Sequence, residues 1–448
     1  MHARFAPVRD CFHDLFSTAR ETGASLSVWH DGVPVIELVG GTTAAVPPGT
    51  VVPAAGADCP WLPDTLVDVY SVGKPVVALC LLLLVDRGRV DLDAPVSAYW
   101  PGFRAPATVR QVLAHTAGLP AFPVPRPAAA VADWDLLCAD LAAADPEWTP
   151  GAVAGEHAWM YGHLVGELVR RVDGRPVGRF LAEEIAGPWR LDLAFGLDEA
   201  DRRRCADLSY ADPAWPDAMR GEPGSLRARA LDNPPGGLDV AMVNSDLWRA
   251  AEIPAVNLHA TAAGLARLYA GLLAGGTLDG VRLFSPELVA EATRCSTPAR
   301  TCCWTGRWTG RSACSGSRTA VGAWAGSAAA APGRTRSAAT PSRTRQPGWP
   351  TTTGWRSWWR RCTPASDLPS RSVIPGRRHA AHSAGRAAVS SLFRLCSAAI
   401  GAAPRRAGIS SQVRNPRKTG TVTFRNRCGY GCRAKGTRGS RPRRVGNH

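Results

Sequence analysis

The stretch SVGKPVVALCLLLLV, residues 71–85, decides the fold of this chain. Its apolar run, residues 76–85, has the length of a buried helix and is too short to span a bilayer. Ser71 stands at the polar start and is predicted to cap the helix, while Pro75 falls in the first turn, where a missing amide hydrogen is tolerated. Lys74 follows Ser71 by one turn, on the same side. The spacing therefore predicts a hydroxyl and an amine in contact.

This pair suggests a specific chemistry. A lysine held neutral can take the proton of Ser71, so that the oxygen attacks a carbonyl and forms an acyl-enzyme. The pattern S-x-x-K is the nucleophile motif of β-lactamases and penicillin-binding proteins. The same spacing also occurs where a serine only caps a helix. The flanking sequence therefore has to distinguish the two interpretations.

The flanks resemble the serine β-lactamase-like hydrolases and esterases, the group of class C β-lactamase and D-alanyl carboxypeptidase, from Phe5 to about Thr293. The segment SLSVWHDGVPVIELVGG, residues 25–41, holds two runs of β-formers around a central His-Asp-Gly, which predicts a hairpin. It is similar to the first two strands of the family sheet. The segment VRQVLAHTAGLP, residues 109–120, is similar to the family's LLxHTSGLP, and this resemblance places His115 in a structural loop.

A further similar segment, residues 150–171, falls where the family carries its catalytic tyrosine, which shares a proton relay with the lysine. Aligned on Gly162, the tyrosine position holds Glu156, and the nearest tyrosine is Tyr161. Three interpretations stay open: Tyr161 substitutes for the missing tyrosine, Glu156 acts as a base, or the site is impaired. A structural interpretation of Tyr161, as a helix residue that faces the core, is equally open.

The resemblance implies an α/β fold for residues 1–294, with a β-lactamase/transpeptidase-like antiparallel sheet and a helical subdomain. This part is long enough for one sizeable core. Apolar residues at helical spacing predict helices at 133–144, 161–172 and 261–273. Residues 254–276 are similar to the helix that follows the family's middle region.

Charge divides the chain into two parts. Residues 295–448 hold 29 lysines and arginines and one acid, Asp367, which gives a net charge of +28. Residues 1–294 hold 24 basic and 36 acidic residues, a net charge of −12, so the whole-chain charge of +16 describes neither part. The spacing of the 13 cysteines indicates neither a metal site nor a disulfide framework.

Residues 295–448 combine their single acid with seven tryptophans and eight cysteines, which is unlike a globular domain and unlike ordinary disorder. One interpretation is a basic arm that binds nucleic acid, with a cluster such as Arg441, Arg443 and Arg444 as its footprint. The other interpretation is a shifted reading frame, and it is favoured because tryptophan has the single codon TGG. When the codons of SWWR at 357–360 are read from their third base, they can give Leu-Val-Glu. This part is then a basic, low-order tail, and the sheet lacks its C-terminal strands. KTG at 418–420 matches the family's third motif but is best explained by chance.

The predicted function is a serine hydrolase that acts on a small-molecule ester or amide, with Ser71, Lys74 and Tyr161 as candidate catalytic residues. An esterase is favoured over a β-lactamase because the N-terminus lacks the apolar stretch of a signal peptide, and a cytoplasmic enzyme would not meet β-lactams at the cell wall. We expect no cofactor, metal, nucleic-acid partner or membrane, and no oligomeric state is predicted. The alternatives are a non-catalytic truncated product and a nucleic-acid binder that uses the basic tail.

Overall fold

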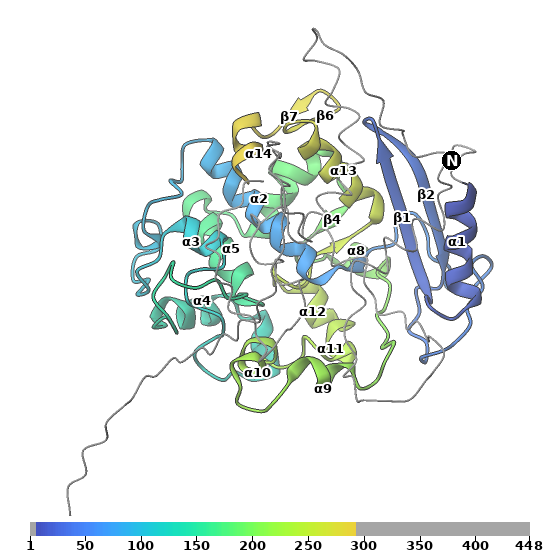
Figure 1. Cartoon of the computed structure of the whole chain (residues 1–448), viewed down its shortest axis with the longest axis horizontal. Coiled ribbons are helices and arrows are strands. Elements are labelled where there is room, and N and C mark those ends of the chain that lie inside the picture. Colours follow the sequence, from blue (N-terminus) through green and yellow to red (C-terminus); the bar gives the residue numbers. More distant parts are fainter. Residues whose placement is uncertain (1–5, 293–448) are drawn as a thin grey trace, which may run out of the picture. The chain divides into compact units, whose positions relative to one another are not determined.

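The computed structural model describes residues 6–292 (Figure 1). Its strands are β1 (Gly23–His30), β2 (Val33–Gly41), β3 (Val67–Asp68), β4 (Leu193–Ala194), β5 (His259–Ala260), β6 (Thr277–Leu278) and β7 (Val281–Arg282). Its longer α-helices are α1 (Ala6–Ser17), α2 (Gly73–Asp86), α4 (Trp134–Ala143), α5 (Met160–Asp173), α13 (Ala262–Leu273) and α14 (Pro286–Ala292).

Short helical segments connect these elements. The short α-helices are α3 (Val109–Leu113), α6 (Val177–Leu181), α7 (Gly187–Trp189), α8 (Glu199–Arg203), α9 (Trp215–Arg220), α10 (Leu226–Leu231), α11 (Val240–Val243) and α12 (Asp246–Ala250). The 3₁₀ segments are η2 (Tyr70–Val72), η3 (Val96–Ala98) and η4 (Ala128–Ala132), and η5 (Ala182–Ala186) is a π-helical turn.

Strands β1 and β2 form the predicted antiparallel hairpin, with a helix on each side. Leu26, Val28 and Ile36 form a small core with α1. Trp29 lies on the other side of the hairpin and packs on the main core. The guanidinium of Arg267 from α13 stacks over its ring, 5.5 Å from the ring centre. Because successive side chains of a strand point to opposite faces, α1 and α13 cover opposite faces of the hairpin (Figure 1).

Helix α2 is the centre of the main core. Every residue from Gly73 to Leu84 is buried, as expected for a helix that is apolar all round. It packs chiefly on α5, which is also buried along most of its length. Its beginning lies beside a small antiparallel sheet with the strand order β3-β5-β4. The backbone of Val69 bonds to Leu258 next to β5, which ties the chain entering α2 to this sheet.

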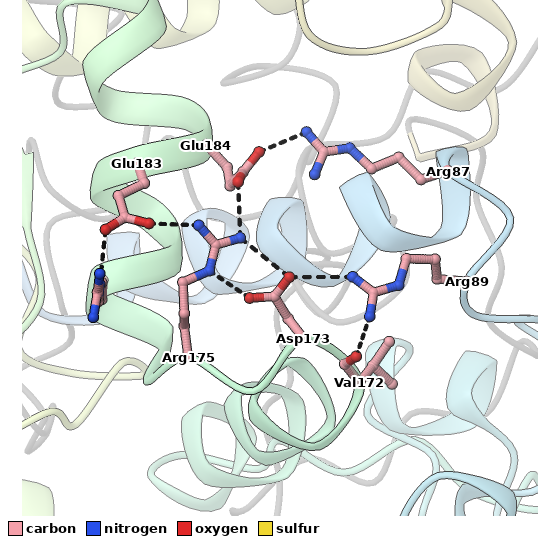
Figure 2. A network of polar contacts seen from close by, with 8 residues as sticks. Arg87, Arg89, Val172, Asp173, Arg175, Glu183 and Glu184 are labelled. Atoms are coloured by element: carbon pink, nitrogen blue, oxygen red, sulfur yellow. Dashed lines mark hydrogen bonds and ion pairs between the residues drawn. The ribbon is translucent and has the colours of Figure 1, made fainter.

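An ion-pair network lies at the C-terminal end of α2 (Figure 2). Arg175 donates to the carboxylates of Asp173 at the end of α5 and Glu184 in η5. Two arginines that follow α2 join this network: Arg87 donates to Glu184 at 2.7 Å, and Arg89 to Asp173 at 3.2 Å. Three helical segments that meet at this point are thereby held together by shared carboxylates.

The predicted elements are largely confirmed. The hairpin, the antiparallel sheet and the helical region are present, and the helices expected at 133–144, 161–172 and 261–273 are α4, α5 and α13. One local prediction was wrong: Ser71 does not cap α2. It lies inside η2, and the N-cap position of α2 is occupied by Val72, without a side-chain cap bond. The predicted tail, residues 295–448, lies outside the described residues.

Candidate active site

A tight turn carries Ser71 into the site. The carboxylate of Asp68, at the end of β3, accepts a hydrogen bond from the amide of Tyr70 at 2.7 Å and another from Trp248 Nε1 at 2.8 Å. Tyr70 adopts a φ of 45°, which a non-glycine residue rarely does. Burial of the Asp68 carboxyl raises its pKa to about 7, and its two hydrogen bonds oppose this shift. Asp68 therefore anchors the turn on which Ser71 stands.

Lys74 and Ser71 are in direct contact, as the spacing predicts. Lys74 Nζ donates to Ser71 Oγ at 2.8 Å and to the carbonyl oxygen of Ala255 at 3.1 Å. The lysine is only 1% exposed. Burial lowers the pKa of Lys74 to about 8, against the opposing influence of Glu156. The amine is therefore easier to deprotonate than an ordinary lysine.

Two glycines allow the Ala255 carbonyl to reach this lysine. A Cβ on Gly73 would lie 2.2 Å from the carbonyl oxygen of Pro254, and one on Gly162 would lie 2.4 Å from the amide nitrogen of Ala255. Residues 254–255 are thus in close contact with both α2 and α5. Side chains at either glycine would push this segment away from Lys74.

Glu156 supplies the third polar group near Lys74. Its Oε1 lies 3.9 Å from Lys74 Nζ. This is the residue that the sequence alignment places at the family's tyrosine position. Burial raises the pKa of Glu156, and the charge of Lys74 lowers it. Its side chain is 39% exposed, so solvent reaches the carboxyl group and screens both effects.

Tyr161 occupies a different environment. Its side chain is 0% exposed, its hydroxyl donates to the carbonyl oxygen of Leu113 at 3.3 Å, and its ring stacks on His115 at 4.4 Å. Burial raises the pKa of this phenol. These contacts correspond to the core interpretation of Tyr161, and no described contact joins it to Ser71 or Lys74. His115 itself lies in the loop after α3 and is 7% exposed.

The use of lysine in this chain is itself informative. Only three of its 53 lysines and arginines are lysines, namely Lys74, Lys418 and Lys435. All other cationic side chains before residue 418 are arginines, which do not lose their proton in proteins. Lys74, the single lysine before residue 418, therefore lies beside Ser71, where a base has to take up and release a proton.

Residues 6–292 were also compared with the requirements of a metal site and of a membrane-spanning helix. In this part of the chain no group of three or more His, Cys, Asp or Glu side chains is arranged to hold a metal ion. None of its helices combines the length and the apolar character needed to cross a membrane.

A hairpin beside a helical core, together with a seryl hydroxyl bonded to a buried lysine one turn away, is typical of β-lactamases and penicillin-binding proteins. The chain belongs to the beta-lactamase family, whose model matches residues 8–314. It is therefore a hydrolase of β-lactamase fold.

Two proteins of similar sequence are named as esterases. The chain is 35% identical over 311 residues to "Esterase/beta-lactamase LipL" of Mycobacterium tuberculosis, covering 65% of this chain and 68% of that protein. It is 32% identical over 169 residues to "Esterase EstB" of Burkholderia gladioli, with 32% and 42% covered.

Solved structures agree with this assignment. A family VIII carboxylesterase matches with a TM-score of 0.57 and 34% identity, covering 66% of this chain and 76% of that one. A penicillin-binding protein homologue from Caulobacter crescentus matches with a TM-score of 0.57 and 38% identity, covering 67% and 77%.

Proposed function

We propose that this chain is a carboxylesterase that forms an acyl-enzyme on Ser71, with Lys74 as the base. The observation that carries this proposal is the 2.8 Å contact between Lys74 Nζ and Ser71 Oγ, made by a lysine that is almost completely buried. A buried amine beside a hydroxyl is one of the ways in which proteins activate a serine nucleophile.

The reaction follows from this contact. Neutral Lys74 takes the Ser71 proton while Oγ attacks the carbonyl carbon of the ester. When the tetrahedral intermediate collapses, the ester C–O bond breaks, and the alcohol leaves with the proton held by Lys74. Water then attacks the acyl carbon and gives a proton to the amine of Lys74. The bond between the acyl carbon and Ser71 Oγ breaks, Oγ takes this proton from Lys74, and the carboxylic acid leaves. Lys74 ends each cycle neutral.

An ester is the favoured substrate class. The names of the relatives support it, since LipL is called an esterase as well as a β-lactamase, and EstB is called an esterase. The similar carboxylesterase structure supports it too. An activated ester also requires less protonation of its leaving group than an amide does, which suits a site whose third polar group is a carboxylate.

Glu156 is expected to slow this reaction at neutral pH. Its carboxylate stabilises the ammonium form of Lys74, which cannot act as a base. Ester hydrolysis should therefore increase as the pH rises through the pKa of Lys74, about 8. This favours the impaired-site interpretation of Glu156 over a direct role as the base.

The test is covalent labelling. A fluorophosphonate probe should label the wild type, and the Ser71→Ala variant should not react, while both are assayed with a chromogenic p-nitrophenyl ester. Ser97→Ala, which alters an exposed serine in η3, is the matched control and should label like the wild type. Equal labelling of the wild type and Ser71→Ala would overturn the assignment of the nucleophile.

A further inference from the structure

Two buried histidines hold the backbone on both sides of Glu156. The amide of Gly155 donates to the carbonyl oxygen of His115 at 3.0 Å, and the amide of His157 donates to His115 Nδ1 at 3.2 Å. His157 closes the same turn from its own side, because its Nδ1 lies 2.7 Å from the carbonyl oxygen of Gly155. The residues before and after Glu156 are thus fixed by hydrogen bonds.

The protonation of His157 follows from its contacts. Its Nε2 accepts a hydrogen bond from the amide of Leu119 at 3.2 Å and therefore carries no proton. The proton lies on Nδ1, which donates to Gly155. Burial and the charge of Lys74 lower the pKa of both His115 and His157, the latter to about 4. Both rings are neutral where the enzyme would work, and His157 has no ring nitrogen left for substrate.

The remaining contacts hold this unit in place. The ring of His115 stacks on Tyr161 of α5, and a Cβ on Gly155 would lie 2.6 Å from the ring of Trp148. His115 adopts a φ of 59°, which directs its carbonyl and its ring toward the same tripeptide. A backbone held so firmly gives the Glu156 side chain a defined starting point.

We propose that His115 and His157 are positioning residues, which hold residues 155–157 so that the Glu156 carboxylate reaches Lys74. The inference rests on the proposed function, because it concerns the charge state of the proposed base. The groups that face the Lys74 amine include Ser71, the Ala255 carbonyl and Glu156. Glu156 is the anion that raises the pKa of Lys74.

The experiment measures the coupling between Glu156 and Lys74 without using activity. The full chain is labelled with ¹³C-lysine, and the Cε signal of Lys74 is titrated by NMR. With only three lysines the spectrum is simple, and Lys74→Met assigns the signal. The shift caused by Glu156→Gln is measured in the wild type, in His115→Ala and in His115→Asn. Taking this difference within each background cancels changes in hydration that the histidine substitutions cause by themselves.

His115→Asn is the matched control. Asparagine tolerates a positive φ, and its Oδ1 can replace Nδ1 as the acceptor for the amide of His157. Glu156→Gln should lower the pKa of Lys74 by about one unit in the wild type and in His115→Asn. In His115→Ala the shift should be less than half as large.

An equal shift in His115→Ala, or no shift in the wild type, would overturn the proposal. If His115→Ala does not fold, amide hydrogen exchange in the wild type decides instead. The amides of Gly155 and His157 should be protected to the same degree as the buried core of α5, whereas rapid exchange would overturn the proposal. A failure of Ser71 labelling would refute the proposed function and leave this measurement interpretable.

Discussion

The substitution Glu156→Gln should increase ester hydrolysis at neutral pH. It removes a negative charge 3.9 Å from Lys74 Nζ and keeps the shape of the side chain. At that distance the Coulomb energy is about 1 kcal/mol at a dielectric constant of 80 and about 4 kcal/mol at 20. Because Glu156 is 39% exposed, the lower value applies, which corresponds to about one pKa unit.

The effect on rate follows from the neutral fraction of the lysine. With a pKa of about 8, about 10% of Lys74 is neutral at pH 7. Lowering that pKa by about one unit makes about 50% neutral, so kcat/KM should rise about fivefold at pH 7. The weaker basicity of the amine offsets part of this gain. Above about pH 9.5 the amine is neutral in both proteins, and the difference should disappear.

The assay is kcat/KM for a p-nitrophenyl ester, measured from pH 5.5 to 10 in the wild type and Glu156→Gln. Glu199→Gln, which alters an exposed carboxylate in α8, is the control and should leave the profile unchanged. A fall in kcat/KM of similar size at every pH would refute the reasoning, because it would identify Glu156 as a base in its own right. A profile identical to that of the wild type would show that the carboxylate does not act on Lys74.

Three further predictions concern other parts of the chain. Tyr161→Phe should leave kcat/KM unchanged and cost about 1 kcal/mol of unfolding free energy, measured in urea, because the hydroxyl donates to Leu113 in the core; a loss of activity of tenfold or more would return the phenol to the proton relay. Arg175→Ala should cost about 1 to 2 kcal/mol and less at 1 M NaCl, whereas Arg203→Ala, in an exposed pair, should cost under about 0.5 kcal/mol; equal costs would show that the network adds nothing. Sequencing the DNA around codon 294 should reveal a shifted frame, and restoring it should increase soluble yield; an intact frame there would contradict this interpretation of residues 295–448.

Elements with a strong local signal were predictable from the sequence. The hairpin has β-forming runs on both sides of an Asp-Gly turn, and α2 has a continuous apolar run that no exposed helix would carry. The predicted helix at 261–273 is observed with Thr261 as its N-cap, bonded to the amide of Gly264. In each case the interaction that determines the structure lies within a few residues of the signal.

The position of Ser71 was not predictable in detail, because distant residues determine it. Asp68 binds the amide of Tyr70 in the turn, and its own carboxylate is held by Trp248, which lies 180 residues further along the chain. This anchoring produces a 3₁₀ turn before α2, so Ser71 comes one step too early to cap the helix. The Ala255 carbonyl is a backbone group and has no sequence signature at all.

The contact of Glu156 with Lys74 lies between these two cases. An alignment with a family pattern indicated its position, since it stands where a tyrosine is expected. The pair of histidines that holds it was not found, because a buried neutral histidine looks the same in sequence as a histidine with any other role. The scarcity of lysine was available in the sequence and would have strengthened the assignment of Lys74.

The isolation of Lys74 as a buried lysine also affects how the protein can be handled. Among residues 6–292 an amine-reactive reagent finds no lysine on the surface, so gentle acylation of the folded protein spares the site. Unfolding reverses this protection. Cyanate in an aged urea solution would carbamylate Lys74 in the open chain, and the product would refold with a neutral, non-basic urea group beside Ser71. A preparation that regains its fold but not its activity after urea treatment would carry this modification. Mass spectrometry would show it as a single carbamyl group on the peptide that contains residue 74.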